Sequence, residues 1–171
     1  PSRRWWAAAG VAVGLVGIAA FAWRANAPPP LALPVLRTSI LPPPGASFGQ
    51  LALSPDGRWL AFIATTRDQR TELWLRPLNS DEAKPLDGTL GASLPFWSPD
   101  SRSIAFYSGF KLKRVDLDNG QVLSICTVGN GRGGAWNQHG QIVISTNFRS
   151  GLSIVPATGG TPKFVTTRDE T

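Results

Sequence analysis

The chain has 171 residues, and its 17 lysines and arginines against 11 aspartates and glutamates give a formal net charge of +6. One Cys and one His exclude an internal disulfide framework and the usual zinc clusters. With 42% hydrophobic and 16% charged residues the chain is not a disordered tail, and its length suits about one ordinary domain.

The first predicted element is a membrane-spanning helix at residues 5–23, preceded by a cytoplasmic flank at residues 1–4. These 19 residues carry no charge. At 1.5 Å per residue they reach about 28 Å, close to the ~30 Å hydrocarbon core of a bilayer. Tryptophan prefers the membrane interface and arginine the water just outside it. The predicted interface anchors are therefore Arg3, Arg4, Trp5, Trp6, Trp23 and Arg24.

The arginines around this helix also account for half of the basic excess. The remaining lysines and arginines are scattered singly along the chain, so no nucleic-acid partner is predicted. Two arginines before the span and one after it favour a cytoplasmic N-terminus, with residue 25 onward on the other side of the membrane. Gly10 and Gly14 have the spacing at which two such helices pack, so a homodimer through the span is a further expectation.

A cleaved signal peptide is the main alternative to this anchor, since Ala25-Asn26-Ala27 has the small-x-small form of a cleavage site. The apolar run is longer than the usual ~7–15 residues, and Arg24 and Pro28 flank the site unfavourably. A buried core helix is the other alternative, but nothing downstream is predicted to surround a helix that is apolar on every face. A retained anchor is therefore the preferred interpretation.

A proline-rich linker is predicted at residues 24–45, which hold seven of the 15 prolines. Three consecutive prolines at 28–30 favour an extended, semi-rigid spacer. Between the proline groups, a short strand is predicted near residues 35–41.

Beyond the linker the sequence repeats itself. Residues 51–58 return at 95–102 and, in degenerate form, at 134–141. A second marker at 73–78 returns at 112–117 and 152–157. Two independent markers with a period of about 40 residues indicate three copies of one structural unit.

Each copy is predicted to hold four short antiparallel strands, the composition of a propeller blade. In the turn after the first strand, Pro presets φ, Asp bonds back to the backbone and Gly tolerates a positive φ. The predicted fold is all-β, a partial β-propeller of about three four-stranded antiparallel blades, preceded by one transmembrane α-helix. Blade one covers residues 46–88, blade two 89–128 and blade three 129–167, with a tail at 168–171. The predicted structural turn residues are Ser54, Pro55, Asp56, Gly57, Ser98, Pro99, Asp100, Ser101, Asn137, Gln138, His139 and Gly140.

The repeated Trp-Ser-Pro-Asp followed by Ile-Ala-Phe, as at residues 97–106, resembles the WD-repeat-like blades of TolB-type β-propellers. The arrangement of arginine-flanked span, proline linker and blades is similar to the sensor region of bacterial receptor-type serine/threonine protein kinases. That resemblance implies a kinase domain before the span, and a propeller on the extracytoplasmic side of the bacterial cytoplasmic membrane. Two features depart from the family: the chain holds no kinase domain, and three blades are fewer than the usual ~4–8 of a closed ring. With no Met, even at position 1, the chain is expected to be part of a longer protein.

Four features were weighed as sites of chemistry, and each has a structural explanation. The glycines at 129, 131 and 134 match a nucleotide-loop pattern, but the repeat places them in a loop between blades. His139 lies in a turn without a nucleophile marked nearby, and Cys126 ends an apolar strand. Asp56 and Asp100 occupy the same slot of two blades and are predicted to form turns. No catalytic residue, cofactor or metal is predicted.

The sequence therefore predicts a non-catalytic, membrane-anchored sensor or protein-interaction module, whose protein or small-ligand partner is unknown. Two alternatives remain open. The chain is the propeller of a membrane-anchored prolyl-oligopeptidase-type serine peptidase, or a stand-alone TolB-like protein-binding propeller.

Overall fold

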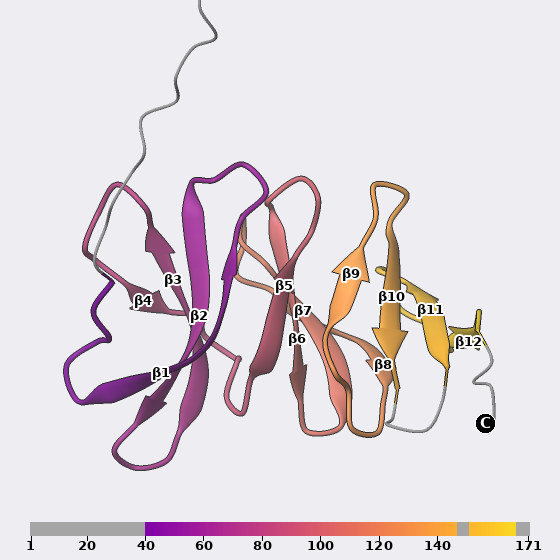
Figure 1. Ribbon diagram of the computed structural model, residues 1–171, viewed down its shortest axis with the longest axis horizontal. Helices are drawn as coiled ribbons and strands as arrows, with labels where there is room; N and C mark the ends of the chain where they lie inside the picture. The colour runs from indigo at the N-terminus through magenta and orange to yellow at the C-terminus, as the bar shows by residue number, and fades with distance from the viewer. Residues whose placement is uncertain (1–39, 147–150, 167–171) are drawn as a thin grey trace, which may run out of the picture. The chain divides into compact units, whose positions relative to one another are not determined.

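The computed structural model describes residues 40–146 and 151–166, which form three four-stranded antiparallel sheets (Figure 1). The predicted all-β class and the three four-stranded sheets are thereby confirmed. The predicted span at residues 5–23, its six anchors and the linker up to residue 39 lie outside the described residues. Among the described residues, no helix has the length and apolarity needed to cross a bilayer.

The first sheet, called blade one, is built from consecutive strands in the order β1-β2-β3-β4. Its strands are β1 (Ala46–Leu53), β2 (Trp59–Thr66), β3 (Thr71–Pro77) and β4 (Lys84–Pro85). The short strand predicted near 35–41 lies largely outside the described residues, of which Ile40 and Leu41 belong to no strand. Prolines 42–44 lack the N–H groups that a ladder needs, so pairing begins only at Ala46.

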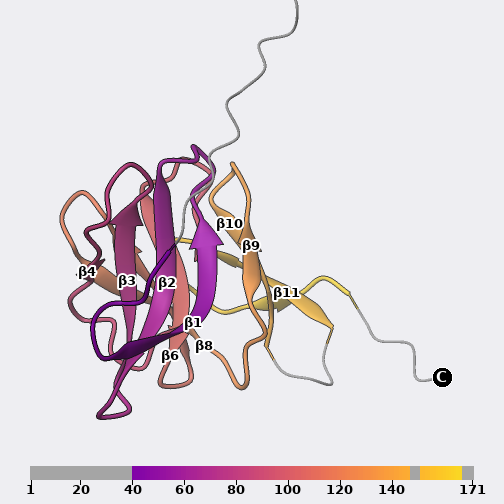
Figure 2. The same ribbon diagram turned by 60° about the vertical axis from the view of Figure 1, so that its left-hand side comes forward.

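Blades two and three repeat the same topology within residues 89–128 and 129–167. Blade two contains β5 (Ser93–Trp97), β6 (Ser103–Ser108), β7 (Lys111–Asp116) and β8 (Val122–Thr127). Blade three contains β9 (Gly134–Trp136), β10 (Gln141–Ser145), β11 (Leu152–Pro156) and β12 (Lys163–Phe164). In both views the β1–β2 and β9–β10 turns lie at one end of the strands, and the β2–β3 turn and β8–β9 loop lie at the other (Figures 1 and 2).

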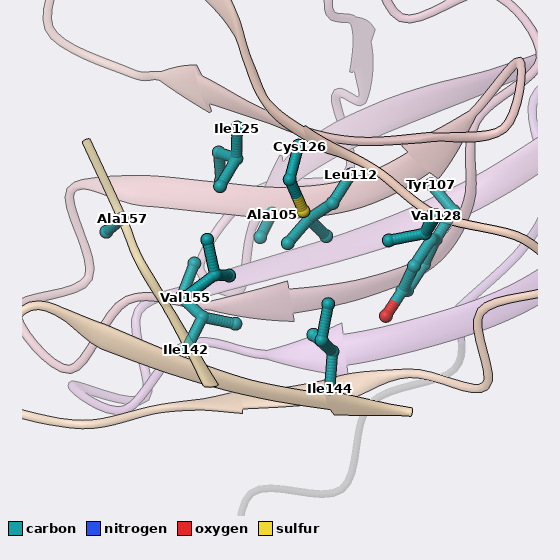
Figure 3. Close-up of a cluster of buried hydrophobic side chains, with 10 residues drawn as sticks. All are labelled: Ala105, Tyr107, Leu112, Ile125, Cys126, Val128, Ile142, Ile144, Val155 and Ala157. Atoms are coloured by element: carbon teal, nitrogen blue, oxygen red, sulfur yellow. The ribbon is translucent and has the colours of Figure 1, made fainter. Parts of the chain in front are cut away.

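The core lies between the blades. Strand β2 is apolar on both faces: Ala61 and Ile63 pack against blade two, and Leu60 and Phe62 pack on the face that points away from it. A second cluster joins blades two and three, where Ile142, Ile144 and Val155 of blade three lie opposite Leu112 and Cys126 of blade two (Figure 3). Each leucine, isoleucine, valine or phenylalanine fully buried in these clusters contributes about 1.5–3 kcal/mol.

Hydrogen bonds across the same two interfaces fix the register of neighbouring blades. The indole Nε1 of Trp97 donates to the carbonyl of Ala52 at 2.9 Å, from blade two to blade one. Between blades two and three, the hydroxyl of Tyr107 donates to the carbonyl of Gly133 at 2.9 Å. Leu53, which occupies the position of Trp97 in blade one, is 54% exposed. At this slot, the tryptophan of blade two thus bonds the neighbouring blade one.

Candidate functional site

Three turns with the predicted motif form one edge of the sheets, called the turn edge and defined by residues 54–57, 98–101 and 137–140 (Figure 1). In blade one, the hydroxyl of Ser54 donates to the carboxylate of Asp56 at 2.5 Å and accepts the N–H of Trp59 at 2.9 Å. In blade two, Ser98 likewise donates to Asp100 at 2.6 Å and accepts the N–H of Ser103 at 2.9 Å. The serine and aspartate thus close the turn with side-chain hydrogen bonds.

The fourth residue of each turn has a left-handed backbone, with φ of +68° at Gly57, +60° at Ser101 and +71° at Gly140. Glycine is the usual residue for this conformation, whereas serine bears a steric cost. In blade two the serine has a compensating contact, because its hydroxyl accepts the N–H of Asp56 at 3.1 Å. This bond ties the turn of blade two to the turn of blade one.

Blade three closes the same turn with a single side chain. The amide oxygen of Asn137 accepts the N–H groups of His139 at 2.9 Å and Gln141 at 3.0 Å. Asparagine therefore replaces the serine–aspartate pair, which explains why the motif looks degenerate in the sequence. His139 itself is exposed and adds only its backbone to the turn.

Hydrogen bonding also sets the charge of this edge. The hydroxyl of Ser54 and the N–H of Arg58 hold the pKa of Asp56 below its usual range. The hydroxyl of Ser98 and the N–H of Arg102 do the same for Asp100. Both carboxylates therefore stay ionised at neutral pH and act as acceptors in the turns rather than as an acid–base pair.

A hollow of about 500 Å³ opens at the turn edge between blades two and three. It brings together six predicted turn residues, Ser98, Pro99, Asp100, Asn137, Gln138 and Gly140. Five further residues line it, namely Ser103, Arg114, Trp136, Ala157 and Thr158. The remaining predicted turn residues lie in blade one or beside the hollow and do not line it.

Arg114 is the cation of this hollow. Its Nη2 lies 3.4 Å from the carboxylate of Asp116, which also accepts a hydrogen bond from Ser103 at 2.6 Å. The Nε of Arg114 is buried and has no hydrogen-bond partner among the described residues. An unsatisfied buried donor costs stability, so the arginine is not placed there for packing alone. Together with Asp100 and the indole of Trp136, it gives the hollow both charges and an apolar wall.

None of the five further lining residues was predicted as a site residue, and Arg114 and Thr158 illustrate why. A signal for Arg114 was present, because alternation in β7 puts it on the same sheet face as the buried Leu112. A charged pair, Arg114 and Asp116, on the same face as the buried Leu112 marks a special environment. Thr158 carries no such signal, since its place depends on how blade three packs against blade two.

The features weighed as alternative chemistry have structural roles. In the glycine loop, a side chain at Gly131 would overlap the ring of Tyr107, whose hydroxyl bonds Gly133. Cys126 is buried, and burial raises the pKa of its thiol. The residues that the structure describes hold no cluster of three or more histidine, cysteine or acidic side chains suited to a metal.

Comparison with known proteins agrees with this architecture. No family model matches the chain. A stretch of 52 residues, 30% of the chain, is 44% identical to the uncharacterized peptidase YuxL of Bacillus subtilis (strain 168), and the match covers 8% of that protein.

Two solved structures share the fold at low sequence identity. TolB from Acinetobacter baumannii aligns with a TM-score of 0.59 and 16% identity over 72% of this chain and 33% of its own. A putative TolB from Agrobacterium tumefaciens aligns with a TM-score of 0.57 and 22% identity, over 74% of this chain and 50% of its own. The described sheets therefore have a TolB-type β-propeller fold, and the chain spans a half or less of these structures.

Proposed function

We propose that this chain is a non-catalytic binding module, with propeller blades held on the extracytoplasmic side of the bacterial cytoplasmic membrane by the span at residues 5–23. The observation that carries the proposal is the hollow at the turn edge between blades two and three. Its walls combine the Arg114–Asp116 pair, the Asp100 carboxylate and the indole of Trp136. Concave sites with an apolar wall and a few placed polar groups are the usual form of a binding site.

The placement of the reactive side chains favours binding over catalysis. The single His of the chain, His139, is exposed on a turn, and among the described residues its ring has no hydrogen-bonded carboxylate to orient it as a base. The thiol of Cys126 is buried and kept protonated. Asp56 and Asp100 are engaged in closing their turns. A sensor that binds a partner and passes the signal through its helix requires none of these groups to react.

The parent that we propose first is a receptor-type serine/threonine protein kinase, on the resemblance of the span, proline linker and blades to that family. A second candidate is favoured by a specific observation, the 44% identity of 52 residues to a protein named as a peptidase. In that case the blades belong to a membrane-anchored serine peptidase of the prolyl-oligopeptidase type.

Extending the reading frame at the genomic locus distinguishes the two parents. Kinase motifs upstream of residue 1 support the first, and a Gly-x-Ser-x-Gly motif downstream of residue 171 supports the second. Exposing the purified chain to a fluorophosphonate probe tests its lack of catalysis, and covalent labelling of a serine in residues 40–166 would overturn that part. Binding at the hollow is tested by a photo-crosslinking residue at Gln138, which should trap a partner in membranes of the native host.

A further inference from the structure

The edge opposite the turn edge has a distinct surface. We call it the entry edge and define it by the β2–β3 turn at 67–70, the β6–β7 turn at Gly109 and Phe110, and the β8–β9 loop at 128–133 (Figure 1). The described chain also enters the first sheet here, because Ala46 pairs with Thr66 at the end of β2. Strand β1 therefore begins at this edge.

An aromatic side chain is displayed at the tip of the central hairpin of this edge. Phe110 is 72% exposed and has a φ of +58°, next to Gly109 with the same φ. Two-residue turns with both φ values positive favour Asn-Gly, and a phenylalanine there opposes both the local backbone preference and the hydrophobic effect. Its backbone is held, since its carbonyl accepts the N–H of Val128 at 2.9 Å. Strain of this kind without a packing reward inside the fold points to a role outside it.

A second apolar side chain adjoins this tip. Leu90 is 53% exposed, and its carbonyl accepts the hydroxyl of Ser108 at 2.8 Å, directly before the hairpin turn. The backbone of Leu90 thus lies beside the hairpin, and the exposed side chains of Leu90 and Phe110 are together called the patch.

Basic side chains surround the patch. A hollow of about 430 Å³ beside Phe110 has Arg132 as the one charged residue in its described lining. Lys111 is exposed next to Phe110, and the Nζ of Lys113 lies 3.5 Å from the hydroxyl of Ser108.

Charge differs between the two edges as a whole. The described connections of the turn edge carry five acidic residues against Arg58 and Arg102: Asp56, Asp81, Glu82, Asp100 and Asp118. Those of the entry edge carry three basic residues against Asp68 and Asp87: Arg67, Arg70 and Arg132. The edge by which the chain enters the sheet is thus the basic one.

We infer that the entry edge docks on an anionic lipid surface, with Phe110 among the lipid head groups and Arg132 and Lys111 against their phosphates. An exposed aromatic beside cations suits the interface of an anionic bilayer. The inference rests on the proposed membrane tether for the choice of a bilayer over an acidic protein. The predicted linker at 24–45 holds 22 residues, whose fully extended reach is at most about 75–80 Å.

The test uses the full chain reconstituted in vesicles of phosphatidylcholine with about 30% phosphatidylglycerol, and in vesicles of phosphatidylcholine alone. A polarity-sensitive fluorophore is attached at Asn130→Cys, an exposed position beside Phe110, with Cys126→Ala to prevent double labelling. The emission should shift to the blue in anionic vesicles only, and high salt should reverse the shift. The Phe110→Asn variant, whose new residue accepts the turn, should lose it.

The control places the same fluorophore at His139→Cys on the turn edge, where no shift is expected. If the emission of the Asn130 label does not shift in anionic vesicles, the inference is overturned and an acidic protein is left as the partner of this edge. An equal emission shift of the His139 label would overturn it as well. The tether is tested separately by alkaline extraction of the vesicles. If alkaline treatment extracts the chain, the proposed membrane span is refuted. Docking of the entry edge can then still be tested, because adding anionic vesicles should give a salt-sensitive emission shift of the Asn130 label.

Discussion

Replacing Trp97 by phenylalanine should weaken the junction of blades one and two in a way that the structure quantifies. The indole is 7% exposed, and its Nε1 donates to the carbonyl of Ala52 in the neighbouring blade at 2.9 Å. Phenylalanine keeps an aromatic ring in the interface but removes the donor and part of the buried ring. The lost hydrogen bond accounts for about 1 kcal/mol and the smaller ring for about another 1 kcal/mol, so the free energy of unfolding should fall by about 2 kcal/mol.

Trp136→Phe is the matched control, because Trp136 occupies the same slot one blade later. It is half-buried, and its indole makes no hydrogen bond within the described part of the chain. Only the smaller size of the ring then lowers the free energy of unfolding. Because Trp136 is half-buried, this decrease should be less than about 1 kcal/mol.

Urea unfolding of the full chain in detergent, followed by circular dichroism in the far ultraviolet, measures both losses without depending on tryptophan emission. Because stacked repeats couple through their interfaces, a weakened junction should also broaden the transition of Trp97→Phe. Equal losses for the two variants would refute the role assigned to the inter-blade hydrogen bond.

Three further predictions concern the turns and loops. The Asp100 carboxylate stabilises the fold at pH values above its unfolded pKa, and this effect is lost as the pH falls through its lowered folded pKa. In an acid titration, the stability of the native chain should therefore fall more steeply below about pH 4 than that of Asp100→Asn. Gly131→Ala should lower the free energy of unfolding by about 1–3 kcal/mol, because the new methyl group overlaps the ring of Tyr107. Phe110→Asn should raise it by up to about 1 kcal/mol in thermal unfolding, because asparagine tolerates a φ of +58°.

Each of these predictions has its own contradicting result. If Asp100→Asn and the native chain lose stability equally steeply as the pH falls, the turn carboxylate does not stabilise the fold. The cost of Gly131→Ala should shrink in a Tyr107→Leu background, and an unchanged cost would place the strain elsewhere. A loss of stability in Phe110→Asn would mean that the aromatic ring packs within the fold.

The strands and turns of the blades could be predicted from the sequence because they depend on local rules. Alternation of apolar residues places the strands, and the Ser-Pro-Asp-Gly pattern carries its own hydrogen bonds, as the bonds of Ser54 and Ser98 show. The third turn was recognisable only by its place in the repeat, since Asn137 closes it with different atoms. The repeat of about 40 residues therefore located the third turn although its local motif had been lost.

The hollow and the entry-edge patch could not be predicted in the same way. Arg114 and Thr158 line one hollow only because blade three packs against blade two. The relative position of neighbouring sheets cannot be predicted from the local sequence pattern. The positive φ of Phe110 opposes the preference of the residue, so that a propensity argument predicts an ordinary turn residue there. The hollow follows from the packing of blade three on blade two, whereas the backbone of Phe110 departs from the local preference of the residue without packing inside the fold.

The central claim, a binding site at the turn edge, is tested most directly by photo-crosslinking from Gln138 in native membranes with and without a residue that fills the hollow. Thr158 is exposed and lines the hollow, so Thr158→Trp should occupy it without disturbing the core, whereas Thr161→Trp lies in the same connection outside the lining. The account predicts a discrete adduct that persists with Thr161→Trp and disappears with Thr158→Trp. An adduct of equal yield in both variants, or none in the native chain, would contradict it.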